Sequence, residues 1–388
     1  MTSLQFGFGT GRRSPNQGHR PEPTELKLLI QPDDHITPIV SAIKGAKKSI
    51  EIVIFRFDRK EIEAALKAAV GRGVFVHALI AYANRGGEQN LRQLEMRFLD
   101  AGVTVARTAN DLVRYHDKMM IIDRHVLYVL SFNYTALDME HSRGFGIVTR
   151  NHRFVQEAVK LFEADTTRQP YTAGLPTFIV SPANARKELG SFIKKAKKEL
   201  LIYDPEIADT EMLRVLNERA KAGVDIKIIG RVSQRGKGLA SQKLSTMRLH
   251  TRTIIRDRHQ AFVGSQSLRK LELDSRREVG LIVRDPAVIR RLIATFELDW
   301  IPSESSVERV ETSPDGNRNM QKAVKLAIKE MPPLATSVKK AVKKAVAAAG
   351  QEAFADKRVK QAVKKVVKKA VKEAMKEVVE TSPSDDAV

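Results

Sequence analysis

An internal repeat restricts what this chain of 388 residues can fold into more than any other feature of its sequence. Residues 41–57 read SAIKGAKKSIEIVIFRF, and residues 191–207 read SFIKKAKKELLIYDPEI. Each copy places a basic amphipathic helix before an apolar, β-branched segment that is typical of a buried strand. A second helix and a second apolar strand follow in both copies. The repeat predicts an α/β fold of two duplicated halves of roughly 130 residues, with mixed sheets flanked by helices, packed pseudo-symmetrically.

The second helix of each copy is followed by a glycine. Gly73 stands in Arg-Gly-Val, and Gly223 stands in Ala-Gly-Val at an offset of 150 residues. A glycine at this place supplies the left-handed backbone conformation that ends a helix and turns the chain into the next strand. We therefore expect a positive φ angle at both glycines.

Changes in composition divide the chain into five segments. Residues 1–25 are rich in Gly, Pro, Arg and Asn, which predicts a flexible tail. The duplicated halves occupy residues 26–168 and 169–302. Residues 303–319 are a Ser/Pro/Gly/Asn-rich linker, and residues 320–388 are a Lys/Val/Ala-rich segment with the apolar spacing of an amphipathic helix.

The charge of the chain predicts an anionic partner. Lys and Arg number 67 against 46 Asp and Glu, which gives a formal net charge of +21. Such an excess indicates nucleic acid or an acidic membrane surface. The basic tail suits either partner, and a solvated or self-associating helix is the third interpretation of it.

The sequence excludes several classes of protein. It has no cysteine, so disulfides and thiolate metal sites are excluded. No apolar segment has the length of a signal peptide or a membrane span. We therefore expect a cytoplasmic protein, peripheral at the membrane or associated with nucleic acid, and a monomer with a pseudo-dimeric core. The histidines have no metal-ligand spacing, and His125, His141 and His152 are interpreted as surface or capping residues.

A second pattern is repeated at the centre of each half. Residues 113–133 read VRYHDKMMIIDRHVLYVLSFN, and residues 247–267 read MRLHTRTIIRDRHQAFVGSQS. Both contain His-x-Lys or His-x-Arg, then Asp five positions further on, then Ser-x-Asn or Ser-x-Ser. Since side chains at i and i+2 of a strand share a face, the histidine and the cation after it are expected to project together.

This doubled pattern resembles the HxK(x)4D(x)6GSxN signature of the phospholipase D superfamily, over about residues 26–300. The resemblance implies that the two motifs meet across a pseudo-dyad and form one site. One histidine then attacks phosphorus to give a phosphohistidine, and the other protonates the leaving oxygen, with no metal and no cofactor. Fixed cations and neutral donors suit such a site because charge grows on the phosphoryl oxygens in the transition state. The implied catalytic residues are His116, His250, Lys118, Arg252, Asn133 and Glu278; the implied substrate-binding residues are Ser131, Ser265 and Ser267; Asp123 and Asp257 are expected to hold the strand–turn geometry.

The chain departs from the family pattern at four positions. Arg252 stands in place of Lys, Ser267 in place of Asn, and Leu130 in place of Gly. Leu130 is expected to crowd the backbone at that turn. Gly144 occupies the place that matches Glu278, so one histidine lacks its orienting carboxylate.

The cross-pairing that the resemblance implies assigns Glu278 to His116. His116 is therefore predicted to be the nucleophile, and His250 the general acid and then the general base. The loop residues Arg85, Arg235 and Lys237 are interpreted either as the mouth of the site or as solvated turns.

Three functions remain open. The first, which we favour from the sequence, is a phosphodiesterase or phosphatidyltransferase that acts on phospholipid head groups through a phosphohistidine. The second is a nuclease or DNA-end-processing phosphodiesterase, which the positive charge of residues 1–319 supports. The third is a catalytically decayed protein that binds DNA or an anionic membrane.

Overall fold

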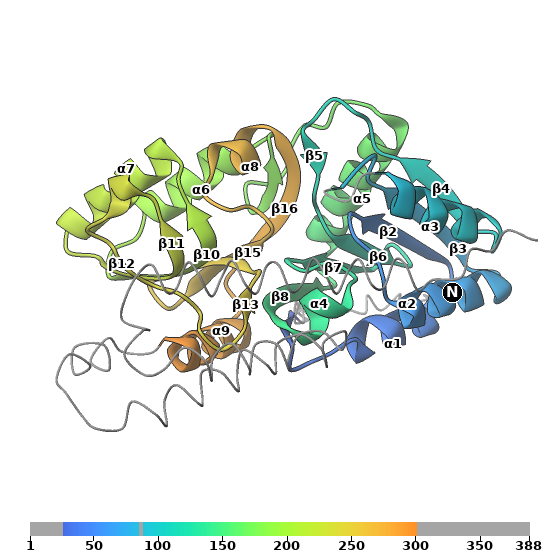
Figure 1. The fold of residues 1–388 in the computed structure, drawn as a ribbon, viewed down its shortest axis with the longest axis horizontal. Coiled ribbons are helices and arrows are strands. Elements are labelled where there is room, and N and C mark those ends of the chain that lie inside the picture. Colours follow the sequence, from blue (N-terminus) through green and yellow to red (C-terminus); the bar gives the residue numbers. More distant parts are fainter. Residues whose placement is uncertain (1–25, 85–87, 301–388) are drawn as a thin grey trace, which may run out of the picture. The chain divides into compact units, whose positions relative to one another are not determined.

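A computed structural model describes residues 26–84 and 88–300 of the chain (Figure 1). The predictions for residues 1–25, Arg85, the linker and the basic tail lie outside these residues. The first half contains eight strands and five helices. They are β1 (Lys27–Gln31), α1 (Thr37–Gly45), β2 (Ser49–Ile54), α2 (Lys60–Gly71), β3 (Phe75–Ile80), α3 (Gln89–Leu99), β4 (Thr104–Arg107), β5 (Arg114–Tyr115), β6 (Met119–Ile122), β7 (Val126–Leu130), α4 (Ala136–Glu140), β8 (Ser142–Thr149) and α5 (His152–Thr167).

The second half repeats this order from β9 onward. Its elements are β9 (Phe178–Ser181), α6 (Ala185–Lys194), β10 (Glu199–Ile207), α7 (Thr210–Lys221), β11 (Asp225–Val232), the 3-10 turn η1 (Gln234–Gly236), β12 (Ala240–Gln242), β13 (Arg248–Leu249), β14 (Arg252–Arg256), β15 (Gln260–Gly264), α8 (Lys270–Asp274), β16 (Arg276–Val283) and α9 (Pro286–Asp299). The predicted duplication into two α/β halves is confirmed.

The two sheets have the same topology. The first runs β1-β8-β7-β6-β2-β3-β4, and the second runs β9-β16-β15-β14-β10-β11-β12. In each sheet, the three strands at one end (β2-β3-β4 and β10-β11-β12) are parallel, and the other pairs in these two runs are antiparallel. Each sheet also takes one short strand from the other half, because β13 pairs with β8 and β5 pairs with β16.

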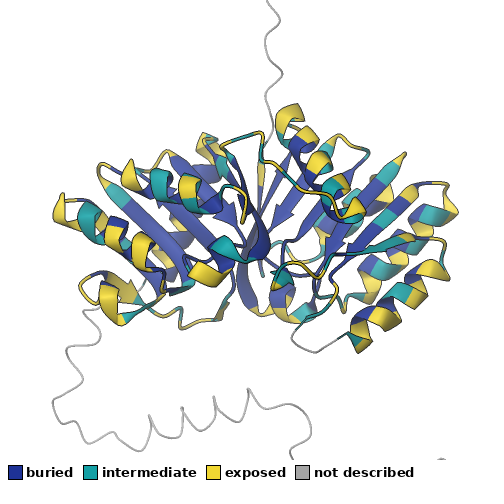
Figure 2. Ribbon diagram, turned by 90° about the horizontal axis from the view of Figure 1, so that it is seen from above, coloured by how far each residue is buried: buried dark blue, intermediate teal, exposed yellow. Residues whose placement is uncertain are grey.

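The halves share a central core. It contains inward side chains of both sheets together with those of α5 and α9, among them Phe145, Leu161, Tyr203 and Phe296. Two outer cores lie under α1–α3 in the first half and under α6–α7 in the second. Figure 2 shows the resulting arrangement, with buried strands between helices that are exposed on one side.

Buried ion pairs tie the halves together at equivalent places. Arg143 in β8 binds Asp299 in α9 through two bonds of 2.8 and 3.0 Å. Arg277 in β16 binds Asp165 in α5 at 2.8 Å. Each guanidinium belongs to one half and its carboxylate to the other. Substitution of one partner would leave a buried charge without compensation, so we expect each pair to be sensitive to mutation.

Local sequence accounts for the ends of the helices. Gly73 and Gly223 have φ angles of 82° and 84°, as predicted for left-handed residues after α2 and α7. The side chain of Asp209 accepts hydrogen bonds from two backbone N–H groups at the start of α7, and that of Asp285 does the same for α9.

The expected crowding at Leu130 is wrong. Leu130 lies inside strand β7 and not in a turn, and its partner across the ladder is Gly146. A Cβ atom on Gly146 would lie 2.7 Å from Leu130 Cδ2, so the missing side chain on one strand makes room for the leucine on the other. No helix within residues 26–84 and 88–300 has the length and apolarity needed to cross a bilayer.

Candidate active site

Two short strands carry the motif histidines into one pocket. β5 pairs with β16 and β13 pairs with β8, so each strand leads its histidine onto the sheet of the opposite half. The His116 N–H donates to the Arg277 carbonyl at 2.8 Å, and the His250 N–H donates to the Arg143 carbonyl at 3.1 Å. Both imidazoles line the same pocket of about 290 Å³. The two motifs therefore converge, as their resemblance implies.

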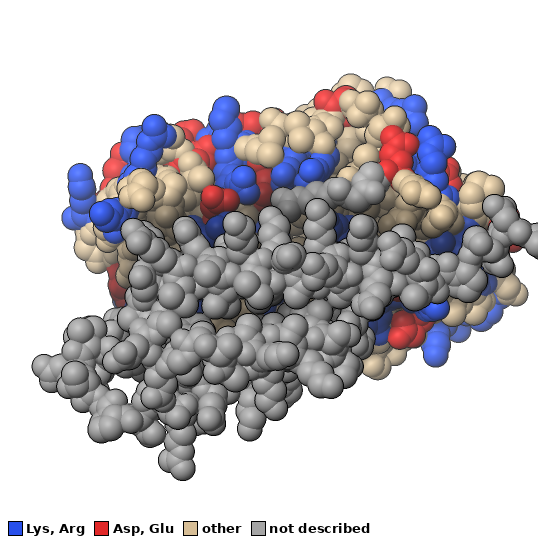
Figure 3. All heavy atoms as spheres, viewed as in Figure 1, with Lys and Arg blue, Asp and Glu red and all other residues tan. Residues whose placement is uncertain are grey.

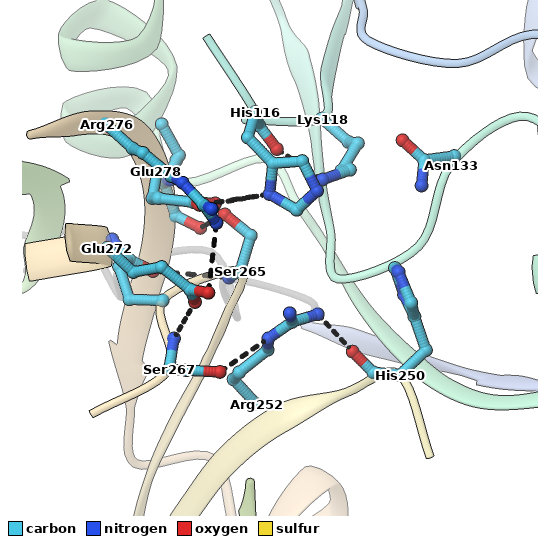
Figure 4. Close-up of polar contacts among 12 residues, drawn as sticks. His116, Lys118, Asn133, His250, Arg252, Ser265, Ser267, Glu272, Arg276 and Glu278 are labelled. Carbon is cyan, nitrogen blue, oxygen red and sulfur yellow. Dashed lines mark hydrogen bonds and ion pairs between the residues drawn. The ribbon is translucent and has the colours of Figure 1, made fainter. Parts of the chain in front are cut away.

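His116 is held from the second half (Figure 4). Its Nδ1 lies 2.9 and 3.0 Å from the two carboxylate oxygens of Glu278, which is fully buried. The Phe55 ring packs edge-on against the imidazole, with 4.6 Å between the ring centroids. When Nδ1–H donates to Glu278, Nε2 carries the lone pair. Burial lowers the pKa of His116, and the cations Lys118 and Arg252 lower it further, which favours this neutral form.

The cations of the two motifs are held differently. Arg252 donates from Nε to Ser267 Oγ at 3.1 Å and from Nη1 to the His250 carbonyl at 2.6 Å. Lys118 donates to the His116 carbonyl, and its ammonium lies 5.4 Å from the centroid of the Phe55 ring. Burial lowers the pKa of Lys118 to about 7. Lys118 is buried and is not among the residues that line the pocket, whereas Arg252 forms part of the wall.

His250 has surroundings unlike those of His116. Its Nδ1 is buried and has no hydrogen-bond partner within the described part of the chain. Its Nε2 lies 3.5 Å from Asp138 Oδ2, a residue that the sequence analysis did not single out. The same Asp138 oxygen accepts from the backbone N–H of Asn133 at 2.8 Å and from its side-chain amide at 2.7 Å. Asn133 and Ser267 both reach the pocket, as predicted.

The pocket wall is rich in arginine. It includes two carboxylates, Glu206 and Glu272, but few apolar side chains: Phe55, Pro205 and Leu249. By contrast, Figure 3 shows Lys and Arg intermixed with Asp and Glu over the described surface on the visible face. The lining of the pocket thus has more cationic than anionic side chains. The arginines that line it are Arg56, Arg114, Arg231, Arg248, Arg252, Arg269 and Arg276.

Some predicted site residues lie elsewhere. Ser131 and Ser265 are fully buried and are not part of the pocket wall. Ser131 Oγ accepts from the Phe145 N–H at 2.8 Å, and Ser265 Oγ bonds to the backbone of Val279. Their assignment to substrate binding is corrected to that of bridges between neighbouring strands.

Of the two interpretations of Arg235 and Lys237, the structure agrees with the solvated turn. Both residues are exposed and neither lines the pocket. Arg231 and Arg269 line this side of the pocket instead. No spacing relative to the motif histidines marks these two arginines in the sequence.

Asp123 and Asp257 act on the backbone. Asp123 accepts from the N–H groups of residues 47–49 at 2.6 to 3.0 Å, and Asp257 accepts equivalently from residues 197–199. Both have positive φ angles, of 54° and 51°, at the tight turn between two strands. These contacts agree with the structural role expected for them. Within residues 26–84 and 88–300, no three His, Asp or Glu side chains are grouped as metal ligands.

A duplicated α/β core with two histidines at the junction of its halves is the architecture of a phospholipase-D-like protein. The chain belongs to the family described as "Cardiolipin synthase, PLD-like domain", whose model matches residues 39–166 and 189–300. The two matched segments cover both halves and both histidine motifs.

Relatives with different names share this fold. Polyphosphate kinase 1 of Chlorobaculum tepidum is 23% identical over 323 residues, which cover 75% of this chain and 46% of the relative. The crystal structure of polyphosphate kinase from Porphyromonas gingivalis matches with a TM-score of 0.61 at 19% identity, covering 71% of this chain and 47% of that one. Phosphatidylserine synthase of Haemophilus influenzae matches with a TM-score of 0.56 at 11% identity, covering 78% and 93%. The chain thus spans less than half the length of the curated polyphosphate kinase, and the structural matches show the fold alone.

Proposed function

We propose that this protein is a phosphodiesterase that works through a phosphohistidine on His116, with His250 as the proton donor and acceptor. One observation carries the proposal: Glu278 binds Nδ1 of a neutral His116 in a pocket that His250 also lines. This arrangement leaves Nε2 of His116 as the nucleophile.

The reaction has two steps. In the first, Nε2 of His116 forms a bond to phosphorus while the bond from phosphorus to the leaving oxygen breaks, and His250 gives that oxygen a proton. In the second, His250 takes a proton from water as the water oxygen attacks phosphorus and the N–P bond breaks. Arg252 and the Asn133 amide stabilise the negative charge that grows on the phosphoryl oxygens in both steps. Each step is an easier displacement than direct attack by water.

The composition of the pocket favours a nucleic acid strand over a phospholipid. Seven arginines line the wall against the two carboxylates Glu206 and Glu272, and this excess of positive charge suits a substrate with several phosphates in succession. A phospholipid requires room for acyl chains, yet the wall offers only Phe55, Pro205 and Leu249 as apolar groups. The head-group activity expected from family membership is therefore our less favoured substrate class.

Polyphosphate is a second candidate substrate. The curated relatives at 23% and 24% identity are named polyphosphate kinases, and a chain of phosphates fits the same arginines. With polyphosphate as the substrate, the bond between His116 Nε2 and phosphorus would form as a phosphoanhydride bond breaks. An acceptor other than water would then make the protein a transferase.

Four substrates separate these functions. With EDTA present, the full-length protein is given end-labelled single-stranded DNA, duplex DNA, cardiolipin-containing liposomes, and long polyphosphate with or without ADP. We expect cleavage of DNA and an acid-labile, alkali-stable label on the protein. The His116→Ala variant should lose turnover by about 10⁴-fold or more and should not take up the label. Full turnover by His116→Ala would refute the mechanism, and turnover of polyphosphate or lipid alone would refute the substrate assignment.

A further inference from the structure

The second histidine lacks the carboxylate that the first one has. Position 144 of β8 is equivalent to Glu278 of β16, and it is a glycine. A side chain has no room there, because a Cβ atom on Gly144 would lie 2.9 Å from Phe132 Cδ1. His250 Nδ1, which such a carboxylate would bind, has no hydrogen-bond partner in the described part of the chain.

A different carboxylate approaches His250 from the opposite side of its ring. Asp138 lies in the first turn of α4, whose N-cap Thr135 accepts a bond from the Asp138 N–H. Its Oδ2 is 3.5 Å from His250 Nε2, and its side chain is only 4% exposed. At 3.5 Å this contact is an ion pair and not a tight hydrogen bond, so the Nε2 proton stays available to a leaving oxygen.

Asp138 is fixed by three further contacts. Oδ2 accepts from the backbone N–H and the side-chain amide of Asn133, and Oδ1 accepts from Arg248 Nη1 at 2.6 Å. Burial opposes the ionised form of Asp138, but His250 and the Asn133 amides outweigh it and hold the pKa of this carboxyl below its usual range. The carboxylate is therefore ionised and held in one place when His250 changes its protonation state.

The equivalent carboxylate in the second half has a different role. Glu272 in α8 accepts from the Ser267 N–H at 2.8 Å and from Arg276 at 3.0 Å. It forms no hydrogen bond or ion pair with His116 in the described residues. Of the two equivalent carboxylates, only Asp138 pairs with a histidine.

We propose that Asp138 is the positioning residue of His250 and holds the protonated ring in place while it acts as the general acid. This role rests on the proposed phosphodiesterase mechanism. The other charged groups that face His250 are cations: Arg248 from β13, Arg252 from β14, and Lys118 next to β6. Each of them disfavours an imidazolium. Burial lowers the pKa of His250 and these cations lower it further, whereas Asp138 raises it, so the paired carboxylate stabilises the protonated ring against all of them.

A direct test measures the titration of His250. Histidine ring resonances are followed against pH in wild type and in Asp138→Asn, with His250 identified by its absence from a His250→Gln sample. We expect the His250 pKa to be lower in Asp138→Asn and to recover in Asp138→Glu. Glu272→Gln, the matched control, should move it less. An unchanged His250 titration in Asp138→Asn would overturn the proposal whether or not the protein has phosphodiesterase activity.

A second test uses the leaving group. A general acid matters for an alkoxide leaving group and little for p-nitrophenolate, because the latter is stable without a proton. At pH 7.5 we expect Asp138→Asn to lose about 100-fold in kcat/KM on a dinucleotide but less than about 5-fold on thymidine 5′-p-nitrophenyl phosphate. Equal losses on both substrates would contradict a role in acid catalysis. If Asp138→Asn does not fold, Asp138→Ser takes its place, since a hydroxyl can still accept from the Asn133 amide. Absence of turnover in wild type would count against the proposed function and leave the titration result standing.

Discussion

Asp117, next to the candidate nucleophile His116, is a buried carboxylate whose charge is expected to lower the stability of the protein at neutral pH. Its side chain is 1% exposed overall, and neither carboxylate oxygen has a hydrogen-bond partner among the described residues. Burial raises the pKa of Asp117 from 3.8 to about 6, although Arg277 opposes this shift. Arg277 already binds Asp165 at 2.8 Å, so one buried guanidinium faces two carboxylates. The equivalent residue in the second half is the neutral Thr251.

The substitution Asp117→Asn removes the second carboxylate. The folded protein binds the Asp117 proton more tightly than the unfolded chain does, so this group makes stability fall as pH rises from 3.8 to about 6. At about 1.4 kcal/mol per pKa unit, the full destabilisation above pH 6 is on the order of 3 kcal/mol, and at pH 4.5 it is on the order of 1 kcal/mol. The variant should therefore gain about 2 kcal/mol more at pH 8 than at pH 4.5. The comparison between two pH values cancels any fixed cost of burying the amide.

Urea unfolding at the two pH values measures this difference. Asp111→Asn is the matched control: its side chain is exposed, and its amide oxygen can still accept the Tyr115 hydroxyl that Asp111 accepts at 2.7 Å. The control should show no comparable dependence on pH. If the difference in unfolding free energy between Asp117→Asn and wild type is the same at pH 4.5 and pH 8, the account of a buried, uncompensated carboxylate is refuted.

Two further predictions concern packing and the backbone. Gly144→Ala should lose about 1 to 3 kcal/mol in urea unfolding, because its Cβ atom would press on Phe132, and Phe132→Leu should restore part of the loss; equal stability of Gly144→Ala and wild type would contradict the contact. Asp123→Ala should lose about 2 kcal/mol in thermal unfolding, because three N–H groups of residues 47–49 lose their acceptor. Asp123→Asn, which keeps one acceptor oxygen, should lose less, and the reverse order would count against this explanation.

Much of the fold could be predicted because its signals are local. The apolar periodicity of each copy and the glycines after α2 and α7 predicted helices and strands that the structure contains. The helix α3 was missed, although the sequence held a sign of it. Equivalent residues lie 150 positions apart as far as Gly73 and Gly223, but only 134 apart at His116 and His250. The missing 16 positions fall in the stretch where the second half has η1 and β12 in place of α3 and β4.

The candidate site was harder to predict because it depends on contacts between the halves. The strands β5 and β13 are two residues long, and no periodicity can mark so short a pairing. The role of Asp138 had a weak signal, since Asp138 and Glu272 share the offset of 134 that relates the two histidines. The two carboxylates differ in the side chains that surround them. Those surroundings depend on how the two halves pack.

The departures from the family motif are matched by their neighbours. Leu130 faces Gly146 across β7 and β8, whereas in the second half Gly264 faces Gly280. The facing position is thus a glycine in both halves, and in the first half its missing side chain gives Leu130 its space. Gly144, likewise, leaves the space that the Phe132 ring occupies. The side chains of Leu130 and Phe132 therefore occupy the space beside Gly146 and Gly144.

The polar residues that depart from the family motif also have neighbours that fit them. Arg252 is longer than Lys, and the residue it meets, Ser267, is shorter than the Asn133 that stands in the first half; the two join in a 3.1 Å hydrogen bond. The glycine at 144 is matched by Asp138, a carboxylate that reaches His250 from another helix. Each motif histidine thus has a buried carboxylate within 3.5 Å of one ring nitrogen, Glu278 for His116 and Asp138 for His250, and the mechanism that we propose uses both contacts.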